Sequence, residues 1–117
     1  MLQEGALAGL KVLELTDQVS GQVAGSFCAR LLGDAGADVV KVEPPQGDHY
    51  RRSGPYPGGV PDPDCSGMFL YLNSNKRGVS LDIESPEGRA AFQDLVAASD
   101  FLVSGQNSAE VERLGLR

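Results

Sequence analysis

The stretch from Lys11 to Pro45 constrains the fold more than any other part of this sequence. Residues 11–16 form a short run of apolar and β-branched side chains, which predicts a strand. From Gln22 onward the apolar residues take a helical spacing, and residues 37–42 predict a second strand. A strand–helix–strand unit of this length requires two parallel strands joined by a right-handed crossover.

The helix in this unit is expected to bury one apolar side. Val23, Phe27 and Leu31 recur every four residues and so share one helix face. Cys28 lies on the same predicted buried side, whereas Cys65 falls in a predicted loop. Because neither cysteine belongs to a CxxC pair, we interpret both as reduced thiols.

The rest of the chain predicts a second set of alternating strands and helices. A Gly- and Pro-rich loop of about 20 residues should be functional or mobile, and a short apolar segment after it should be a buried helix. Two later helices each begin at a serine that is expected to cap the first turn. The predicted segments are a loop over 46–66, a buried helix over 67–73, a strand over 78–83, a helix from Ser85, a strand over 101–103 and a helix over 108–114.

This order of elements predicts an α/β fold, in which a partial doubly wound, Rossmann-like parallel sheet has helices on both faces. We expect residues 1–117 to form one domain of this type, and to be an incomplete one. Ligands of such sheets bind outside the carboxyl ends of the strands. The loop over 17–21, which follows the first strand, is therefore the first candidate for a functional site.

Composition excludes several functions. The net charge of −6 argues against a nucleic-acid partner, which requires a basic face for phosphates. Residues 41–77 are about neutral, whereas the rest of the chain is strongly acidic, so this segment is the expected donor of cations to an anionic ligand. The sequence lacks a signal-peptide pattern and any apolar run of roughly 20 residues, which predicts a cytoplasmic protein without membrane contact.

Signatures of common active sites are also missing from the sequence. It contains no GxGxxG, no GxxxxGK[ST], no HExxH, and only one histidine, so we expect no metal site. Four carboxylates near the first two strands have no spacing that marks an acid–base pair, and we interpret them as solvated side chains or helix caps. They are Glu14, Asp17, Glu43 and Asp48. The residues alone indicate only an α/β domain with a candidate nucleotide site.

Longer motifs add more. Four stretches are LAGLKVLELT (7–16), LLGDAGADVVKVEPPQGD (31–48), FLYLNSNKRGVSLDIESPEGR (69–89) and VERLGL (111–116). In this order and spacing they resemble the N-terminal part of the class III CoA-transferase family, the carnitine dehydratase and bile-acid-inducible protein F group. This family includes formyl-CoA and succinyl-CoA transferases and α-methylacyl-CoA racemases.

The resemblance implies a Rossmann-like, CoA-binding portion of an interlocked homodimeric enzyme. In the family a catalytic aspartate forms a mixed anhydride with the acyl group, and CoA binding places the thioester carbonyl beside it. That aspartate would follow Arg117, and no aspartate of this chain, Asp100 included, matches it. We therefore assign no catalytic residue and expect this chain alone to be inactive.

Part of the family's CoA site can be placed on this sequence. The loop after the first strand should contact the nucleotide, and Leu81 should lie near the adenine. Many members carry a phosphate-binding arginine at the position where this chain has Pro44, and two later arginines should replace it. The predicted CoA-binding residues are Gln18, Val19, Ser20, Gly21, Leu81, Arg51 and Arg52.

Other departures from the family pattern also fall on the ligand side. Gln22 replaces a frequent proline, Glu84 replaces a lysine, and Gly105 interrupts a motif whose asparagine helps to hold CoA.

Three hypotheses for the function stay open. In the first, the chain is the N-terminal segment of a CoA transferase or racemase that uses acyl-CoA, as a homodimer or joined to the rest of a longer enzyme. In the second, it is a degenerate, non-catalytic scaffold or dimerisation domain of the same fold. In the third, it is an unrelated nucleotide-binding or response-regulator-like domain.

Overall fold

The structure is a computed structural model that describes residues 5–16, 23–105, 107–113 and 115. Its strands are β1 (Lys11–Leu15), β2 (Asp38–Glu43), β3 (Lys76–Ser80) and β4 (Phe101–Ser104). Its α-helices are α1 (Ala24–Asp34), α2 (Gly67–Leu72), α3 (Pro86–Ala97) and α4 (Ser108–Arg113). Two short 3₁₀ helices, η1 (His49–Arg52) and η2 (Pro57–Gly59), lie in the long connection before α2. None of the helices in the described ranges is long and apolar enough to cross a membrane.

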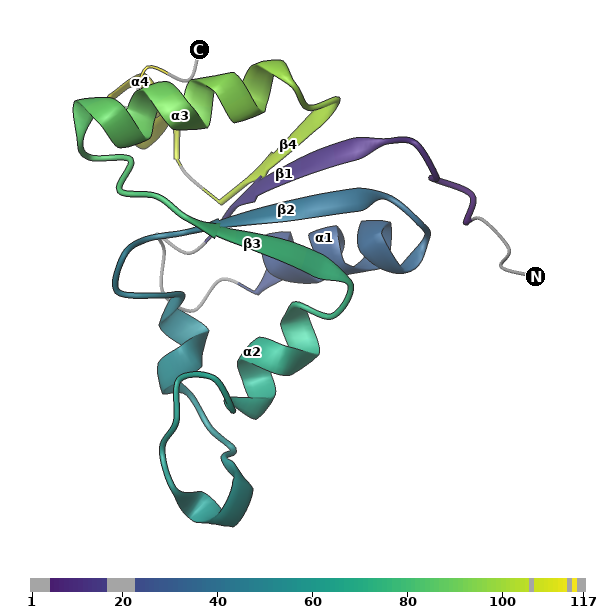
Figure 1. The fold of residues 1–117 in the computed structure, drawn as a ribbon, viewed down its shortest axis with the longest axis vertical. Coiled ribbons are helices and arrows are strands. Elements are labelled where there is room, and N and C mark those ends of the chain that lie inside the picture. The colour runs from purple at the N-terminus through teal and green to yellow at the C-terminus, as the bar shows by residue number, and fades with distance from the viewer. Residues whose placement is uncertain (1–4, 17–22, 106, 114, 116–117) are drawn as a thin grey trace.

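The four strands form one parallel sheet in the order β3-β2-β1-β4. Register pairs Leu13 with Val40 on one side and with Leu102 on the other, so β1 is an inner strand. Helices cover both faces, with α1 on one and α3 on the other (Figure 1). This confirms the predicted α/β fold with a doubly wound parallel sheet.

Alternation along the strands divides the core between these two faces. Toward α3, the buried residues are apolar along the whole sheet, and Phe92 packs against Leu13, Leu15 and Val42. Toward α1, a smaller apolar cluster occupies only the first half of the strands. Its buried members are Val12, Ala29, Ala37 and Val39. The second half of this face is filled by polar and charged side chains, which form the candidate site.

The serine predicted to cap α3 does so, whereas the cap of α4 is one residue earlier than predicted. Ser85 is the N-cap of α3, since its side chain accepts a hydrogen bond from the Gly88 amide, and Pro86 takes the first helical position. For the last helix, the expected cap at Ser108 is wrong. Asn107 accepts the hydrogen bond from the Glu110 amide instead, and Ser108 is the first residue of α4.

The predicted buried side of α1 is wrong. Val23, Phe27 and Leu31 are exposed, and so is Cys28, whereas Ser26 and Ala29 face the sheet. Small residues face inward because α1 lies close to the sheet. A Cβ added at Gly25 would meet the Thr16 methyl group at 2.7 Å, and one at Gly33 would meet the Asn75 carbonyl oxygen at 3.1 Å.

Two other predictions also need correction. The short helix after the long loop does form, as α2, but Met68, Leu70 and Tyr71 are exposed and only Leu72 is buried within it. The third strand begins at Lys76 rather than at residue 78 and ends at Ser80. The hydropathy pattern misplaced its start because the inward-facing residue there is a charged lysine whose partner is a buried glutamate.

Candidate functional site

The carboxyl ends of β1, β2 and β3 lie at one edge of the sheet, where the ligand of a doubly wound fold binds. The four predicted loop residues Gln18, Val19, Ser20 and Gly21 fall outside the described residues. Leu81 directly follows β3, and its amide donates a hydrogen bond of 2.9 Å to the Glu43 carbonyl. Its side chain is half-buried and packs against the apolar cluster on the α3 face.

Arg51 is held in place by several neighbours. Its Nε lies 3.1 and 3.2 Å from the two carboxylate oxygens of Glu43, and its Nη1 donates to the Pro63 carbonyl at 2.9 Å. Its guanidinium also stacks on the Phe69 ring, 3.8 Å from the ring centroid. The charge of Arg51 is therefore paired with that of Glu43, and its role in binding phosphate stays a prediction.

Arg52, which follows it, is exposed and less constrained. Its Nη1 makes one long hydrogen bond of 3.4 Å to the Gln46 carbonyl. No ion pair of Arg52 is found within the part of the chain that the structure describes. Of the two predicted phosphate-binding arginines, Arg52 is therefore the one whose charge is available to a ligand.

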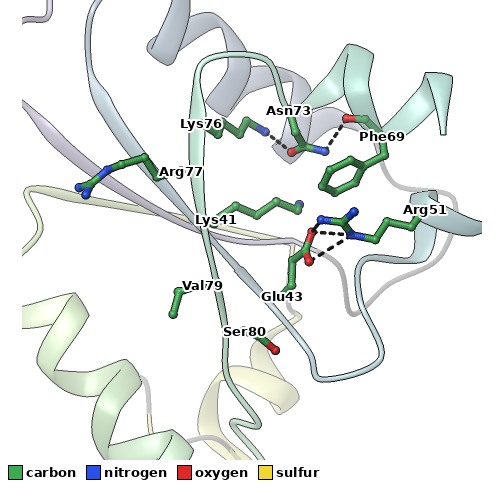
Figure 2. A pocket seen from close by; sticks show the side chains of 10 residues that line it. Lys41, Glu43, Arg51, Phe69, Asn73, Lys76, Arg77, Val79 and Ser80 are labelled. Carbon is green, nitrogen blue, oxygen red and sulfur yellow. Dashed lines mark hydrogen bonds and ion pairs between the residues drawn. The ribbon is translucent and has the colours of Figure 1, made fainter. Parts of the chain in front are cut away.

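A cavity of about 340 Å³ opens between α2, η1 and the exposed edge of β3. Figure 2 shows Arg51 and Phe69 on one side of it and Lys76, which donates a hydrogen bond to Asn73, on another. Glu43 and Ser80, the last residues of β2 and β3, close its carboxyl-end side. The cavity therefore reaches the carboxyl edge of the sheet, at which β1 also ends.

Four buried charges lie beside this cavity on the α1 face of the sheet, and we call them the buried ion network. It consists of Glu14, Lys41, Asp48 and Lys76. The Lys41 Nζ lies 2.8 Å from Glu14 Oε2 and 2.6 Å from Asp48 Oδ2. The Lys76 Nζ lies 2.6 Å from Glu14 Oε1. Two positive and two negative groups balance, so the network can be buried without a net charge.

The network shifts the pKa values of its members in different directions. Burial raises the pKa of Glu14, but the nearby ammonium groups of Lys41 and Lys76 outweigh burial and hold that pKa below its ordinary value. Burial lowers the pKa of Lys41, yet attraction to Glu14 and Asp48 leaves it raised. For Lys76 burial prevails over attraction to Glu14, and its pKa is lowered. A cavity-lining lysine with a lowered pKa is typical of functional sites.

Sequence reasoning missed this network. Glu14 and Asp48 were predicted to be solvated or to cap helices, but both are buried. The capping prediction is confirmed for Asp48, whose Oδ1 accepts a 2.7 Å hydrogen bond from the Tyr50 amide at the start of η1. The signal that could have revealed Glu14 is its position between Leu13 and Leu15 in a buried stretch of an inner strand. No group of three His, Cys, Asp or Glu side chains in the described ranges is arranged to hold a metal ion.

Comparison with known proteins identifies the family. A model of CoA-transferase family III matches residues 7–117. The chain belongs to CoA-transferase family III. Family III motifs and the buried ion network coincide, since Glu14, Lys41, Asp48 and Lys76 all lie within the stretches that resemble the family.

Individual relatives of family III agree with this assignment. The chain is 39% identical over 109 residues to a succinyl-CoA:mesaconate CoA-transferase of Haloarcula hispanica, covering 93% of this chain and 26% of that protein. It is 36% identical over 110 residues to an (R)-2-hydroxy-4-methylpentanoate CoA-transferase of Clostridioides difficile, covering 94% and 27%. The chain thus spans about a quarter of the length of these relatives.

A solved structure of family III type supports the fold as well. The crystal structure of a CAIB/BAIF family protein from Brucella suis superposes with a TM-score of 0.82 at 34% identity. The superposition covers 98% of this chain and 29% of the Brucella chain. The four-stranded parallel sheet is therefore a fold that this family is known to adopt.

Proposed function

We propose that this chain is the N-terminal, CoA-binding segment of a cytoplasmic enzyme that transfers CoA between acyl groups or racemises an acyl-CoA. The observation that carries the proposal is the family III match, which begins at residue 7, before β1, and continues to residue 117. The names of the two relatives above, both CoA-transferases, support acyl-CoA as the substrate. Since we assign no catalytic aspartate to this chain, we expect it to bind CoA without turning it over.

Binding would take place at the carboxyl edge of the sheet. The loop over 17–21 follows β1 at this edge and is proposed to contact the nucleotide, with Leu81 on the adenine side. Arg52 is exposed and makes one long hydrogen bond, so we assign it to the CoA phosphates. Arg51 is assigned a supporting role, because Glu43 and the Phe69 ring already hold its guanidinium.

Isothermal titration of the 117-residue chain with CoA tests the proposal. We expect micromolar binding that weakens by about fivefold in Arg52→Gln, which corresponds to the loss of one charge-assisted phosphate contact of about 1 kcal/mol. Lys11→Gln is the matched control, since Lys11 is also an exposed cation but lies at the amino end of β1, the opposite end of the sheet. The absence of saturation at millimolar CoA would contradict CoA binding by this chain, and equal effects of the two variants would contradict the role of Arg52.

One observation favours the alternative, a non-catalytic scaffold or dimerisation domain of the same fold. Large apolar side chains are exposed side by side on α1 and α2, where Phe27 stacks on Tyr71 with ring centroids 6.5 Å apart. Such a surface is typical of a protein interface. We propose that it is covered in a homodimer or by the rest of a longer enzyme. Oligomer formation together with a lack of CoA binding would favour this alternative.

A further inference from the structure

We propose that Asp48 is a positioning residue for the binding of the CoA phosphates. It joins the buried ion network to η1, the 3₁₀ turn that carries Arg51 and Arg52. The inference rests on the proposed function, in which Arg52 binds the phosphates, and adds to it the residue that holds Arg52 in place. All the contacts that carry it lie between β2 and the long connection after it.

The two carboxylate oxygens of Asp48 make different contacts. Oδ2 lies 2.6 Å from the Nζ of Lys41 on β2, and Oδ1 accepts a 2.7 Å hydrogen bond from the Tyr50 amide at the start of η1. The side chains of Lys41 and Asp48 are only 2% and 1% exposed, so solvent screens this ion pair weakly. One carboxylate therefore caps η1 and attaches it to the sheet.

A second ion pair attaches η1 to β2 with the opposite polarity. Glu43 lies two residues after Lys41, so both side chains point to the α1 face of the sheet. The Nη2 of Arg51 lies 3.0 Å from Glu43 Oε1. A shift of η1 by two residues along β2 would place Asp48 beside Glu43, and like charges would then repel each other. The two pairs together therefore select one position of η1 on the strand.

The carbonyl groups of η1 are held by side chains from later in the connection. The Ser66 hydroxyl contacts the Ser53 carbonyl oxygen and lies 2.6 Å from the Tyr50 carbonyl oxygen. The Tyr56 hydroxyl donates a 3.1 Å hydrogen bond to the Arg51 carbonyl. These contacts fix the shape of the turn within the connection, whereas the two ion pairs fix its position on the sheet.

The orientation of η1 determines where the Arg52 side chain lies. Successive side chains of a 3₁₀ turn point about 120° apart. Because Tyr50 is buried and Arg51 turns toward Glu43, Arg52 is directed outward and is exposed. Arg52 lines a second cavity, of about 440 Å³, beside η1, which has room for a phosphate group. Rotation of η1 would therefore move the guanidinium that we assign to phosphate away from this cavity.

Two charge-balanced double variants provide the test. Lys41→Met with Asp48→Asn removes the ion pair that attaches η1, keeps a side-chain oxygen that can cap it, and leaves Glu14 paired with Lys76. Glu14→Gln with Lys76→Met is the matched control. It removes the same number of buried charges but leaves Lys41 paired with Asp48. Because neither double variant leaves a net buried charge, both should fold.

The dependence of CoA affinity on Arg52 is the decisive measurement, because a general loss of stability does not change it. Arg52→Gln is expected to weaken CoA binding by about fivefold in the unaltered chain. The same substitution should have an effect of less than about twofold when combined with Lys41→Met and Asp48→Asn, and of about fivefold in the control. A fivefold effect in both double variants would overturn the inference, and so would loss of the effect in both.

Hydrogen exchange tests the attachment without ligand, and it applies even where CoA binding is too weak to titrate. The Ser53 amide donates to the Tyr50 carbonyl and reports on η1, whereas the Leu81 amide donates to the Glu43 carbonyl and reports on the sheet. Exchange at Ser53 should be faster in the Lys41→Met, Asp48→Asn variant than in the control, and exchange at Leu81 should be similar in the two. Equal exchange at Ser53 would overturn the inference.

The titration separates failure of the inference from failure of the proposed function. If the unaltered chain binds CoA and the effect of Arg52→Gln persists after Lys41→Met and Asp48→Asn, the positioning role of Asp48 is overturned and the proposed function stands. If the unaltered chain does not bind CoA, the proposed function fails and the inference fails with it.

Discussion

Lys76 Nζ lies 2.6 Å from Glu14 Oε1, although β2 separates the strands that carry these two residues. The contact is possible because Lys76 extends across the face of β2 beneath α1, where Lys41 meets the same carboxylate. Three adjacent strands are thus connected by side chains as well as by backbone hydrogen bonds. The three strands are therefore cross-linked by side chains that meet at Glu14 and Lys41, toward the carboxyl ends of β1 and β2.

Removing one member of the buried ion network should strongly destabilise the chain. Glu14→Gln leaves Lys41 and Lys76 with a single buried carboxylate, at a cost of about 3–5 kcal/mol in the free energy of unfolding. Lys41→Met should cost a similar amount. Urea unfolding of both single variants and the double variant measures their coupling, and the double variant should lose clearly less than the sum. Additive losses would show that the two residues do not act together.

Stability should fall in acid in a manner that depends on Glu14. Its pKa is held below the ordinary value of 4.5, so the charged form contributes stability above pH 4.5 that is lost as the pH falls through the folded-state pKa. The stability deficit of Glu14→Gln relative to the unaltered chain should therefore shrink below pH 4.5. Urea midpoints measured between pH 7 and pH 3 test this, and a deficit independent of pH would contradict it.

The apolar core on the α3 face should be sensitive at Phe92. This side chain is fully buried against Leu13 and Leu15, and Phe92→Ala should cost about 3–5 kcal/mol through lost burial and an unfilled cavity. Phe101→Ala is the control, since Phe101 is 56% exposed and should cost far less. Thermal unfolding of the two variants gives the comparison. Similar losses would mean that Phe101 is buried in the folded chain in solution.

Two glycines should respond to alanine in opposite directions. A Cβ at Gly88 would lie 1.8 Å from the Asp82 carbonyl oxygen, so Gly88→Ala should destabilise α3 despite the gain of about 1 kcal/mol expected from helix propensity. At Gly78, on the outer strand β3, an added Cβ meets nothing within 4 Å. Gly78→Ala should be neutral or stabilising by roughly 0.5–1 kcal/mol. Chemical denaturation measures both, and a stabilised Gly88→Ala would contradict the close contact.

The isolated chain should self-associate through its exposed apolar surface. Leu31 on α1 is 52% exposed, and Leu70 and Tyr71 on α2 are each 54% exposed. Light scattering should detect oligomers of the chain, and Leu31→Glu combined with Tyr71→Glu should reduce them. Arg77→Gln, which leaves this surface intact, is the control. A monodisperse, folded monomer of the unaltered chain would contradict the prediction.

Much of the fold was accessible from the sequence, because the helix and strand periods and the Ser85–Pro86 start are local signals. The inward side of α1 was not accessible. Phe27 and Leu31 do share one apolar side of the helix, but this side faces outward. Because α1 lies close to the sheet, only small residues such as Ser26 and Ala29 fit between them. Periodicity identifies an apolar face without stating which neighbour will cover it.

The candidate site was predictable only in part. The sequence placed Arg51 among the expected phosphate-binding residues but did not predict its pairing with Glu43, because this pairing depends on how the long loop folds back on β2. Glu14 and Lys76 are separated by 62 residues in the sequence, so no spacing rule could have joined them. Resemblance to a family indicated which stretches matter, whereas the contacts between those stretches required the three-dimensional structure.

The buried ion network also limits how this sequence can change. Each charge in it is balanced by a charge on a different strand or on the loop after β2, so a single replacement leaves the network with a net buried charge. A fully apolar replacement would require Glu14, Lys41, Asp48 and Lys76 to change together. Single substitutions at these four positions are therefore selected against. In any library of variants selected for folding, we expect the four residues to be retained together or replaced together.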